Sequence, residues 1–299
     1  MHQDHEPFHD VHFMRMVLEQ RKHKGRFAVF MIHKDASRIT DMQDVASFQT
    51  RHAAAAAHPP QHSLAHSLWL HLLPGVLIVL FALIVGPVII RTGLPLLLVP
   101  SLWVLCVLIP FELGYLLSEG MKRNGRLSLR GIVLYREPMS MKAYLLLIPA
   151  LIVWAIVVFT LISAPIEPYL IKTFFFWMPG WFFSLFTIGN AGAQTHLILL
   201  LAVLLNIITN LAASFVEELY FRGYLLPRLA HQGAWAPLIN TVLFSLYHLF
   251  SPWQNIARIL AILPMTYSVA WKKNILVSII THCTLDVLSA TVLLVMLYR

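Results

Sequence analysis

Long apolar runs separated by short polar segments dominate the chain after residue 66. A helix needs about 20 apolar residues to cross the hydrocarbon core of a bilayer. Runs that approach or reach this length lie near 69–90, 94–117, 143–164, 195–226, 235–250, 256–271 and 274–298. The aromatic stretch 174–186, which Pro179 and Gly180 interrupt, is typical of an interfacial helix or of a further, broken span. The sequence therefore predicts an all-α, polytopic transmembrane helical bundle with about 7–8 spans.

Composition excludes the soluble class. Hydrophobic residues make up 58% of the 299 positions and charged residues 12%, whereas soluble domains carry about a quarter charged residues. The formal net charge is +8, but the basic residues lie mostly in the N-terminal segment and in loops between apolar runs. This distribution indicates anchoring at an anionic membrane surface and no nucleic-acid partner.

The chain divides into three regions. Residues 1–66 are polar and hold most of the histidines, eleven of fifteen lying at or before His71. Because these histidines follow no repeat spacing, we expect a disordered cytoplasmic tail and not a metal-binding one. Residues 67–192 form the N-terminal transmembrane helices and loops, and residues 193–299 form the helices that carry the motifs described below.

Basic loops predict the orientation in the membrane. The connection 119–142 holds six Lys or Arg against two Glu, and Lys272 and Lys273 follow at a connection of the same parity. Both loops and the N-terminus should face the cytoplasm, in a plasma membrane if the chain is bacterial. If the stretch 174–186 crossed the membrane, Lys272 would lie outside, so we favour the non-spanning interpretation.

Three charges stand together in the run 195–226. Polar positions recur there every four residues, which on a helix forms one ridge: Asn206, Asn210, Ser214, Glu218 and Arg222. Glu218 and Arg222 have the spacing of an intrahelical ion pair. Glu217 is left over, and a buried, incompletely paired carboxylate can accept and return protons as a general base. The alternative is that all three charges form a helix-end cluster at the cytosolic interface.

Two further spans carry histidines. Phe244 and His248 share a face of one span, and His282 and Asp286 have the same spacing in the last span. Either histidine alone could be a structural one, but an acid one turn from His282 can orient it. We therefore expect one polar site shared by three spans. Glu112 is expected to be an interfacial charge, and Arg258, at the start of its span, should extend outward.

The three segments together resemble a known family. "EELYFR" (217–222), "FSLYH" (244–248) and "HCTLD" (282–286) fit the ordered motifs E-E-x-x-x-R, F-x-x-x-H and H-x-x-x-[N/D]. This set is similar to that of the CPBP family, the type II CAAX prenyl proteases and their bacteriocin-processing and immunity relatives. The resemblance covers roughly residues 195–290.

The resemblance implies a helical intramembrane endopeptidase whose site opens to the cytosolic side. Glu217 would act as general base on a water molecule that His248 helps to position. His282 would stabilise the oxyanion, assisted or oriented by Asp286, and Glu218, Arg222 and Phe244 would support the site. Asp286 stands where the prenyl proteases carry asparagine, and an ionised aspartate cannot donate a hydrogen bond to an oxyanion.

Several alternatives remain open at this stage. Glu217, His248 and His282 are also a usable zinc set, so the cofactor is either none or zinc; the lack of H-E-x-x-H favours none. A proton-coupled transporter would also use buried Glu, His and Asp, although no internal repeat is evident. A non-catalytic immunity or scaffold member is the third alternative. The expected partners are the bilayer and a membrane-associated peptide or protein substrate.

Overall fold

The computed structural model describes residues 59–186 and 196–297, and these residues form a bundle of helices. The all-α prediction is confirmed, because these two ranges contain no β-strand and only two isolated β-bridges. The α-helices are α4 (Leu64–Thr92), α5 (Leu98–Trp103), α6 (Ile109–Asn124), α7 (Met141–Val158), α8 (Ala164–Phe174), α9 (His196–Glu217), α10 (Trp235–Tyr247), α11 (Asn255–Lys272) and α12 (Leu276–Leu297). The predicted polar tail lies almost entirely outside the described residues.

Short π and 3-10 segments join or extend these helices. The π segments are η2 (Val104–Leu108), η3 (Phe159–Ser163) and η5 (Glu218–Leu225). The 3-10 segments are η4 (Gly180–Ser184), η6 (Leu226–Gln232) and η7 (Pro252–Gln254). Each π segment continues an α-helix. A predicted span therefore corresponds to an α-helix together with the π segment that adjoins it.

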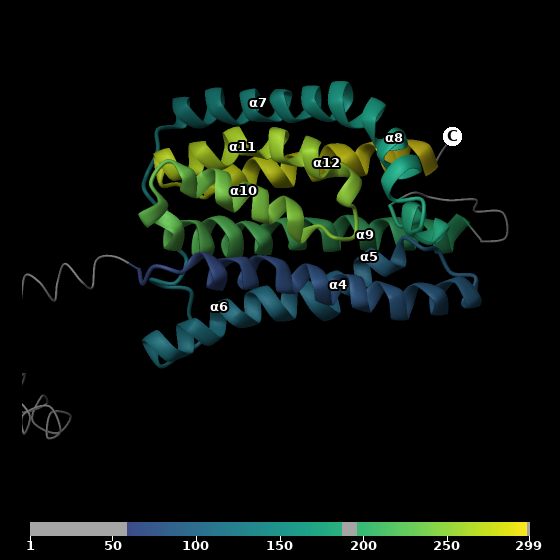
Figure 1. The fold of residues 1–299 in the computed structure, drawn as a ribbon, viewed down its shortest axis with the longest axis horizontal. Helices are drawn as coiled ribbons and strands as arrows, with labels where there is room; N and C mark the ends of the chain where they lie inside the picture. The colour runs from purple at the N-terminus through teal and green to yellow at the C-terminus, as the bar shows by residue number, and fades with distance from the viewer. Residues whose placement is uncertain (1–58, 187–195, 298–299) are drawn as a thin grey trace, which may run out of the picture. The chain divides into compact units, whose positions relative to one another are not determined.

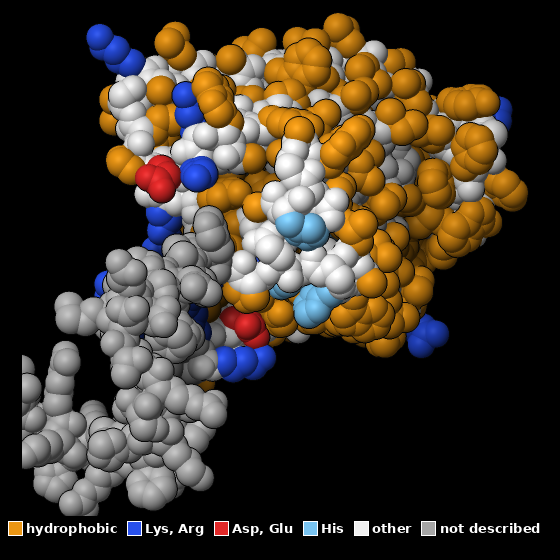
Figure 2. Space-filling model, turned by 60° about the vertical axis from the view of Figure 1, so that its left-hand side comes forward, with side chains coloured by type: hydrophobic (Ala, Val, Ile, Leu, Met, Phe, Trp, Pro, Cys, Tyr) orange, Lys and Arg blue, Asp and Glu red, His pale blue; other side chains and the backbone are white. Residues whose placement is uncertain are grey.

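Five helical runs are long and apolar enough to cross a membrane: Leu64–Thr92, Leu98–Asn124, Met141–Phe174, His196–Gln232 and Leu276–Val295. The helices α10 and α11 lie outside this set, and α10 has only 13 residues. They pack against each other as a hairpin that η7 connects. Five long runs and this hairpin account for the seven predicted apolar runs. Figure 2 shows hydrophobic side chains over most of the face in view, as contact with lipid requires.

The aromatic stretch 174–186 forms no spanning helix within its described residues. The helix α8 ends at Phe174, and Pro179 precedes the five-residue segment η4. A proline with no N–H and a short 3-10 turn cannot continue the α-helical ladder. The stretch is too short and too broken to cross a bilayer.

The helices that carry the three motifs lie in the middle of the bundle. Figure 1 shows α7 along one edge, α6 along the opposite edge, and α9 to α12 between them. Helix α9 packs against α12, and α10 packs against α4 as well as α11. At Gly75 of α4, a Cβ atom would collide with the backbone carbonyl of Tyr247. Glycine therefore permits the close approach that seats the end of α10 in the interior.

The two basic loops meet at one end of the bundle. The loop between α6 and α7 binds the turn between α11 and α12, with the Glu137 N–H donating to the Lys273 carbonyl at 2.9 Å. The Ile275 N–H donates to the Tyr135 carbonyl at 2.8 Å, and the Leu134 N–H donates to the Gly223 carbonyl of η5 at 2.8 Å. Both loops thus lie on the same side of the bundle, as their shared parity predicts.

Candidate active site

The first motif lies where α9 changes from α-helix to π-helix. Glu217 is the last residue of α9, and Glu218 begins the π segment η5. Insertions of this kind widen the helix locally and occur frequently at functional sites. All eight residues of η5 are buried. The carbonyl of Phe221 in this segment also accepts a hydrogen bond from the Asn240 side chain at 3.0 Å, which fixes η5 to α10.

Glu218 joins the first motif to the third. The Arg222 Nη1 lies 3.3 Å from the Glu218 Oε1, and both side chains are fully buried, so the predicted ion pair is present. The His282 Nδ1 donates to the same oxygen at 2.9 Å. The Arg222 guanidinium also lies 3.9 Å from the centre of the Phe244 ring, in the second motif. A buried carboxylate is costly without partners, and here Arg222 and His282 compensate Glu218, while the Phe244 ring face stabilises the Arg222 cation.

Glu217 is held by a residue that the sequence did not single out. The residue is 6% exposed, and its Oε1 accepts a hydrogen bond from the Tyr247 hydroxyl at 3.1 Å. The Tyr247 ring packs against the His248 imidazole, with centroids 4.7 Å apart. Tyr247 thus connects the predicted base to the predicted water-positioning histidine. Its place inside "FSLYH" was a usable signal, because a buried phenol needs a polar partner.

His248 is fixed by its own helix end. It is the first residue after α10, and its Nδ1–H donates to the Phe244 carbonyl at 2.8 Å. A carbonyl oxygen only accepts, so this bond places the proton on Nδ1 and leaves Nε2 as an acceptor in the neutral ring. The Phe244 ring stands edge-on to the imidazole, with centroids 4.8 Å apart. The second motif therefore presents one free ring nitrogen in a defined orientation.

Asp286 and His282 have different partners. Asp286 lies one turn beyond His282 on α12, and its carboxylate accepts a hydrogen bond from the Ser214 hydroxyl of α9. Glu218, and not Asp286, is hydrogen-bonded to the His282 ring. Ser214 belongs to the polar ridge predicted on α9, so this ridge contacts α12 through Asp286.

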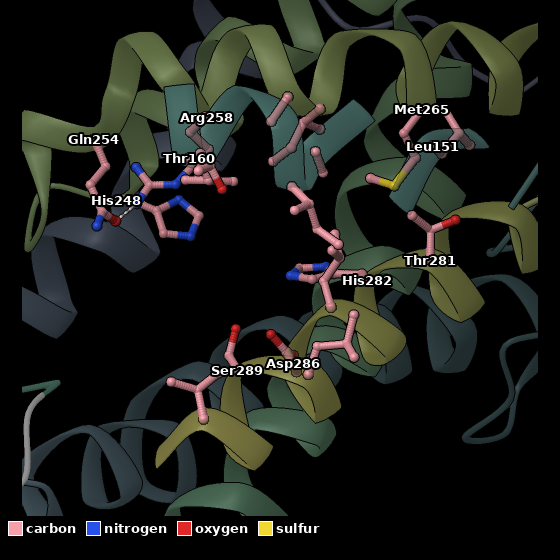
Figure 3. Close-up of a pocket in the computed structure, with 18 of the residues that line it drawn as sticks. Leu151, Thr160, His248, Gln254, Arg258, Met265, Thr281, His282, Asp286 and Ser289 are labelled. Carbon is pink, nitrogen blue, oxygen red and sulfur yellow. Dashed lines mark hydrogen bonds between the residues drawn. The ribbon is translucent and has the colours of Figure 1, made fainter. Parts of the chain in front are cut away.

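A cavity of about 750 Å³ is lined by Phe244, His248, His282 and Asp286 of the motifs, whereas Glu217, Glu218 and Arg222 do not line it. It lies between α7, α11, α12 and the end of α10, and its walls are mainly hydrophobic. Figure 3 shows His248 and Arg258 on one side and His282 with Asp286 on the other, with open space between the two imidazole rings. The residues that line it without being hydrophobic are Thr160, His248, Gln254, Arg258, Thr281, His282, Asp286, Ser289 and Thr291.

Two expectations about charged residues are wrong. Arg258 does not extend outward but is 7% exposed and lines the cavity. Burial is tolerated because Ser251, Gln254 and Asn255 accept hydrogen bonds from its guanidinium at 2.8, 3.0 and 2.8 Å. Glu112 is not interfacial but fully buried, because α6 continues to Asn124, about three turns beyond it.

The described residues do not assemble a metal site. In residues 59–186 and 196–297, no group of three His, Cys, Asp or Glu side chains could hold a metal ion. The predicted zinc set of Glu217, His248 and His282 therefore does not fit a three-ligand centre in this arrangement. Zinc stays a prediction.

Residues 198–288 match the family model described as type II CAAX prenyl endopeptidase Rce1-like. No curated protein and no solved structure matches the chain. The matched segment runs from α9 into α12 and contains all three motifs. The match confirms the resemblance predicted from the sequence. It supports a CAAX protease-like peptidase in an integral membrane protein.

Proposed function

From the Rce1-like family pattern of residues 198–288, we propose that the protein is an intramembrane endopeptidase with Glu217 as its general base. It would hydrolyse a peptide bond in a membrane-associated peptide or protein. One observation carries this proposal: His282 donates to Glu218 at 2.9 Å, so the first and third motifs meet beside the cavity that His248 also lines.

The free ring nitrogen of His248 suits it to position water. Its Nε2 can accept one O–H of a water molecule, because Nδ1–H is committed to the Phe244 carbonyl. Glu217 takes the other proton while the water oxygen attacks the scissile carbonyl carbon. When the C–N bond breaks, Glu217 returns the proton to the leaving amine. The products are a carboxyl terminus and an amine.

His282 supplies the donor for the oxyanion. Its Nδ1–H is held by the Glu218 carboxylate, so a protonated ring directs Nε2–H into the cavity. The Arg222 ion pair keeps Glu218 in place for this task. Asp286 accepts from Ser214 and, when ionised, offers no donor; it therefore acts by linking α12 to α9.

The walls of the cavity fit a substrate that arrives through the membrane. Ile156, Leu288 and Val292 line it and are also 45%, 42% and 55% exposed on the surface of the bundle. A lateral opening between α7 and α12 would admit an apolar segment directly from lipid. By the positive-inside rule, the basic loops favour a cytoplasmic location for their end of the bundle.

The test uses the purified full chain in proteoliposomes and a fluorogenic peptide that ends in a prenylated C-a-a-X sequence. A second peptide without the prenyl group reports whether the lipid chain is required. We expect cleavage by the wild type and a loss of about 10²–10⁴-fold in Glu217→Gln, with fragments identified by mass spectrometry. The matched control is Glu119→Gln, because Glu119 is a partly exposed partner of Lys122.

Full activity of Glu217→Gln would contradict the assigned base. A folded wild type that leaves both peptides intact, and does so with membrane-associated leader peptides as well, would contradict the peptidase function. The same preparation tested for proton uptake into the vesicles would then examine the transporter alternative.

A further inference from the structure

Arg258 is a buried cation in the wall of the cavity, and the mechanism above gives it no role. The residue is 7% exposed and belongs to α11. Figure 3 shows it beside His248, across the open space from His282 and Asp286. Among the described residues that line the cavity, it is the only Lys or Arg. A permanent positive charge therefore borders the space in which a substrate would bind.

The contacts of Arg258 hold its side chain in place without neutralising it. The Arg258 Nη1 donates to the Asn255 Oδ1 at 2.8 Å, and the Nη2 donates to the Ser251 Oγ and the Gln254 Oε1 at 2.8 and 3.0 Å. All of these acceptors are neutral, and they use fewer N–H groups than a guanidinium has. The side chain is thus fixed in orientation and can still bind an anion.

The acids around the cavity have other partners. Among the described residues, no carboxylate forms an ion pair with Arg258. Glu167 reaches it only through Gln254, whose amide donates to the Glu167 Oε1 at 3.2 Å. Glu217 and Asp286 accept hydrogen bonds from hydroxyl groups of other residues, and Asp286 lies across the cavity.

A second buried arginine shows a complete ion pair in the same bundle. Arg222 lies 3.3 Å from the Glu218 carboxylate, and both side chains are fully buried. A buried cation is costly unless an opposite charge compensates it. Arg222 has this compensation within the protein, whereas Arg258 lines a cavity. A carboxylate that enters the cavity would supply it, because a guanidinium matches the geometry of a carboxylate and forms charge-assisted hydrogen bonds with it.

We propose that Arg258 is a substrate-binding residue whose guanidinium binds a carboxylate of the substrate peptide. This role rests on the proposed peptidase function. The carboxylate is either the C-terminus of the peptide or an acidic side chain near the cleaved bond. A cavity of about 750 Å³ has the volume of a small-molecule pocket and admits only a short peptide segment. An ionised Asp286 on the opposite wall repels the same carboxylate, so the two charges favour one direction of binding.

The test measures binding without turnover. Glu217→Gln protein in lipid nanodiscs is titrated with three fluorescent versions of the C-a-a-X peptide: the free acid, its C-terminal amide, and an amide whose last residue is Asp. We expect the free acid to bind about 10–100-fold more tightly than the plain amide, the effect of a charge-assisted hydrogen bond. If only the amide with Asp gains this affinity, the bound carboxylate is an acidic side chain. Equal affinity for all three peptides would overturn the proposal.

The preference for a carboxylate should depend on Arg258 and not on buried arginines in general. Arg258→Gln, added to the same protein, should bind the carboxylate peptide and the plain amide alike, because it keeps a polar side chain and loses the charge. The matched control is Arg228→Gln. Arg228 is 3% exposed, donates to the Tyr224 and Ile132 carbonyls, and does not line the cavity. A preference that survives in Arg258→Gln, or that Arg228→Gln also removes, would overturn the proposal.

A conservative variant covers the case in which Arg258→Gln does not fold. Arg258→Lys keeps the positive charge at the same position, so it should still prefer the carboxylate peptide, although an ammonium lacks the planar fork of a guanidinium. Equal binding of carboxylate and amide peptides by folded Arg258→Lys would overturn the proposal.

Turnover separates this proposal from the peptidase function. In the active enzyme, Arg258→Gln should raise KM for the carboxylate peptide about 10–100-fold and keep kcat within about threefold, because the contact is the same in ground and transition states. KM for the plain amide should not change. An equal rise in KM for both peptides would indicate general damage and overturn the proposal. Carboxylate-dependent binding without cleavage of any peptide would contradict the peptidase function and leave the carboxylate site in place.

Discussion

Two histidine centres in the helical bundle of this protein differ in what their ring nitrogens do. In the first, His248 and His282 each use Nδ1 within the protein, to the Phe244 carbonyl and to Glu218, and both rings line the cavity. In the second, His71 of α4 is fully buried and both of its nitrogens are occupied. Its Nδ1–H donates to the Ser67 carbonyl at 2.7 Å, and its Nε2 accepts from Asn240 at 3.0 Å.

This difference in hydrogen bonding distinguishes a candidate catalytic histidine from a structural one. A ring with one nitrogen held and one directed into a cavity is oriented for chemistry and still has a nitrogen to use. A ring with both nitrogens hydrogen-bonded inside the bundle links two helices. It has no nitrogen left to contact a substrate. We call the first the open centre (His248, His282) and the second the closed centre (His71 with Ser67 and Asn240). The closed centre is also the more deeply buried one, because His71 is fully buried whereas the His282 side chain is 21% exposed.

The largest effect should follow from removing the buried cation beside the open centre, since Arg222 pairs with the Glu218 that His282 also contacts. Arg222→Leu leaves Glu218 without its ion-pair partner in a fully buried position. Breaking one half of a buried pair costs about 3–5 kcal/mol. We expect a corresponding fall in the free energy of unfolding, measured by denaturant titration in mixed micelles.

The matched control is Lys122→Leu, which removes the cation of an exposed pair. Lys122 lies 2.6 Å from Glu119, with side chains that are 68% and 26% exposed. Solvent screens an exposed pair, which then contributes little to stability, so this change should have little effect. If the two substitutions lowered the free energy of unfolding equally, the buried Glu218 would not depend on its ion pair with Arg222 for stability.

A ring that stabilises an oxyanion should affect catalysis more than folding. His282→Ala removes the Nε2 donor from the cavity, and loss of one such donor costs about 10²–10³-fold in kcat. Thr284→Ala, two residues along α12, is the control, because its hydroxyl bonds only to its own helix. If His282→Ala kept full kcat, the open centre would be structural, and the contrast with His71 would vanish.

The local parts of the site follow from the sequence. The spacing of Glu218 and Arg222 predicts their ion pair, and the structure contains it. The apolar runs predict where the helices lie, because the bilayer fixes both length and hydrophobicity. Both signals depend only on neighbours along one helix.

The missed parts depend on contacts between helices. Glu112 was placed at an interface because its apolar run was expected to end near residue 117, whereas α6 continues to Asn124. Tyr247 binds Glu217, and Glu218 binds His282, across 30 and 64 positions of the chain. Helical spacing cannot predict such pairs. It shows which residues share one face of a helix, but not which other helix packs against that face. Arg258 was different: its acceptors Ser251, Gln254 and Asn255 are local, and their polarity was a readable signal.

The closed centre should respond in stability and not in catalysis. His71→Leu leaves the Asn240 amide without one acceptor inside the bundle, and an unsatisfied buried donor costs about 1–3 kcal/mol. We expect that fall in the free energy of unfolding, with kcat of the folded fraction unchanged. Ser67→Ala, which removes only a hydroxyl 3.3 Å from the same ring, should cost less. A lower kcat in folded His71→Leu would place this ring in the active site after all.

Metal removal should have the smallest effect, and it tests what the free nitrogens of the open centre are for. In the proposed mechanism the His248 Nε2 accepts a hydrogen bond from water, and the protonated His282 Nε2 donates one to the oxyanion. Neither nitrogen therefore coordinates a metal ion. Dialysis against a chelator should then leave kcat unchanged, with metal content checked by mass spectrometry. Zinc binding would instead require both Nε2 atoms and Glu217 at about 2.0–2.2 Å from one ion. Activity that disappears with chelator and returns with zinc would therefore require these three side chains to move together, and would replace the glutamate mechanism with the metal one.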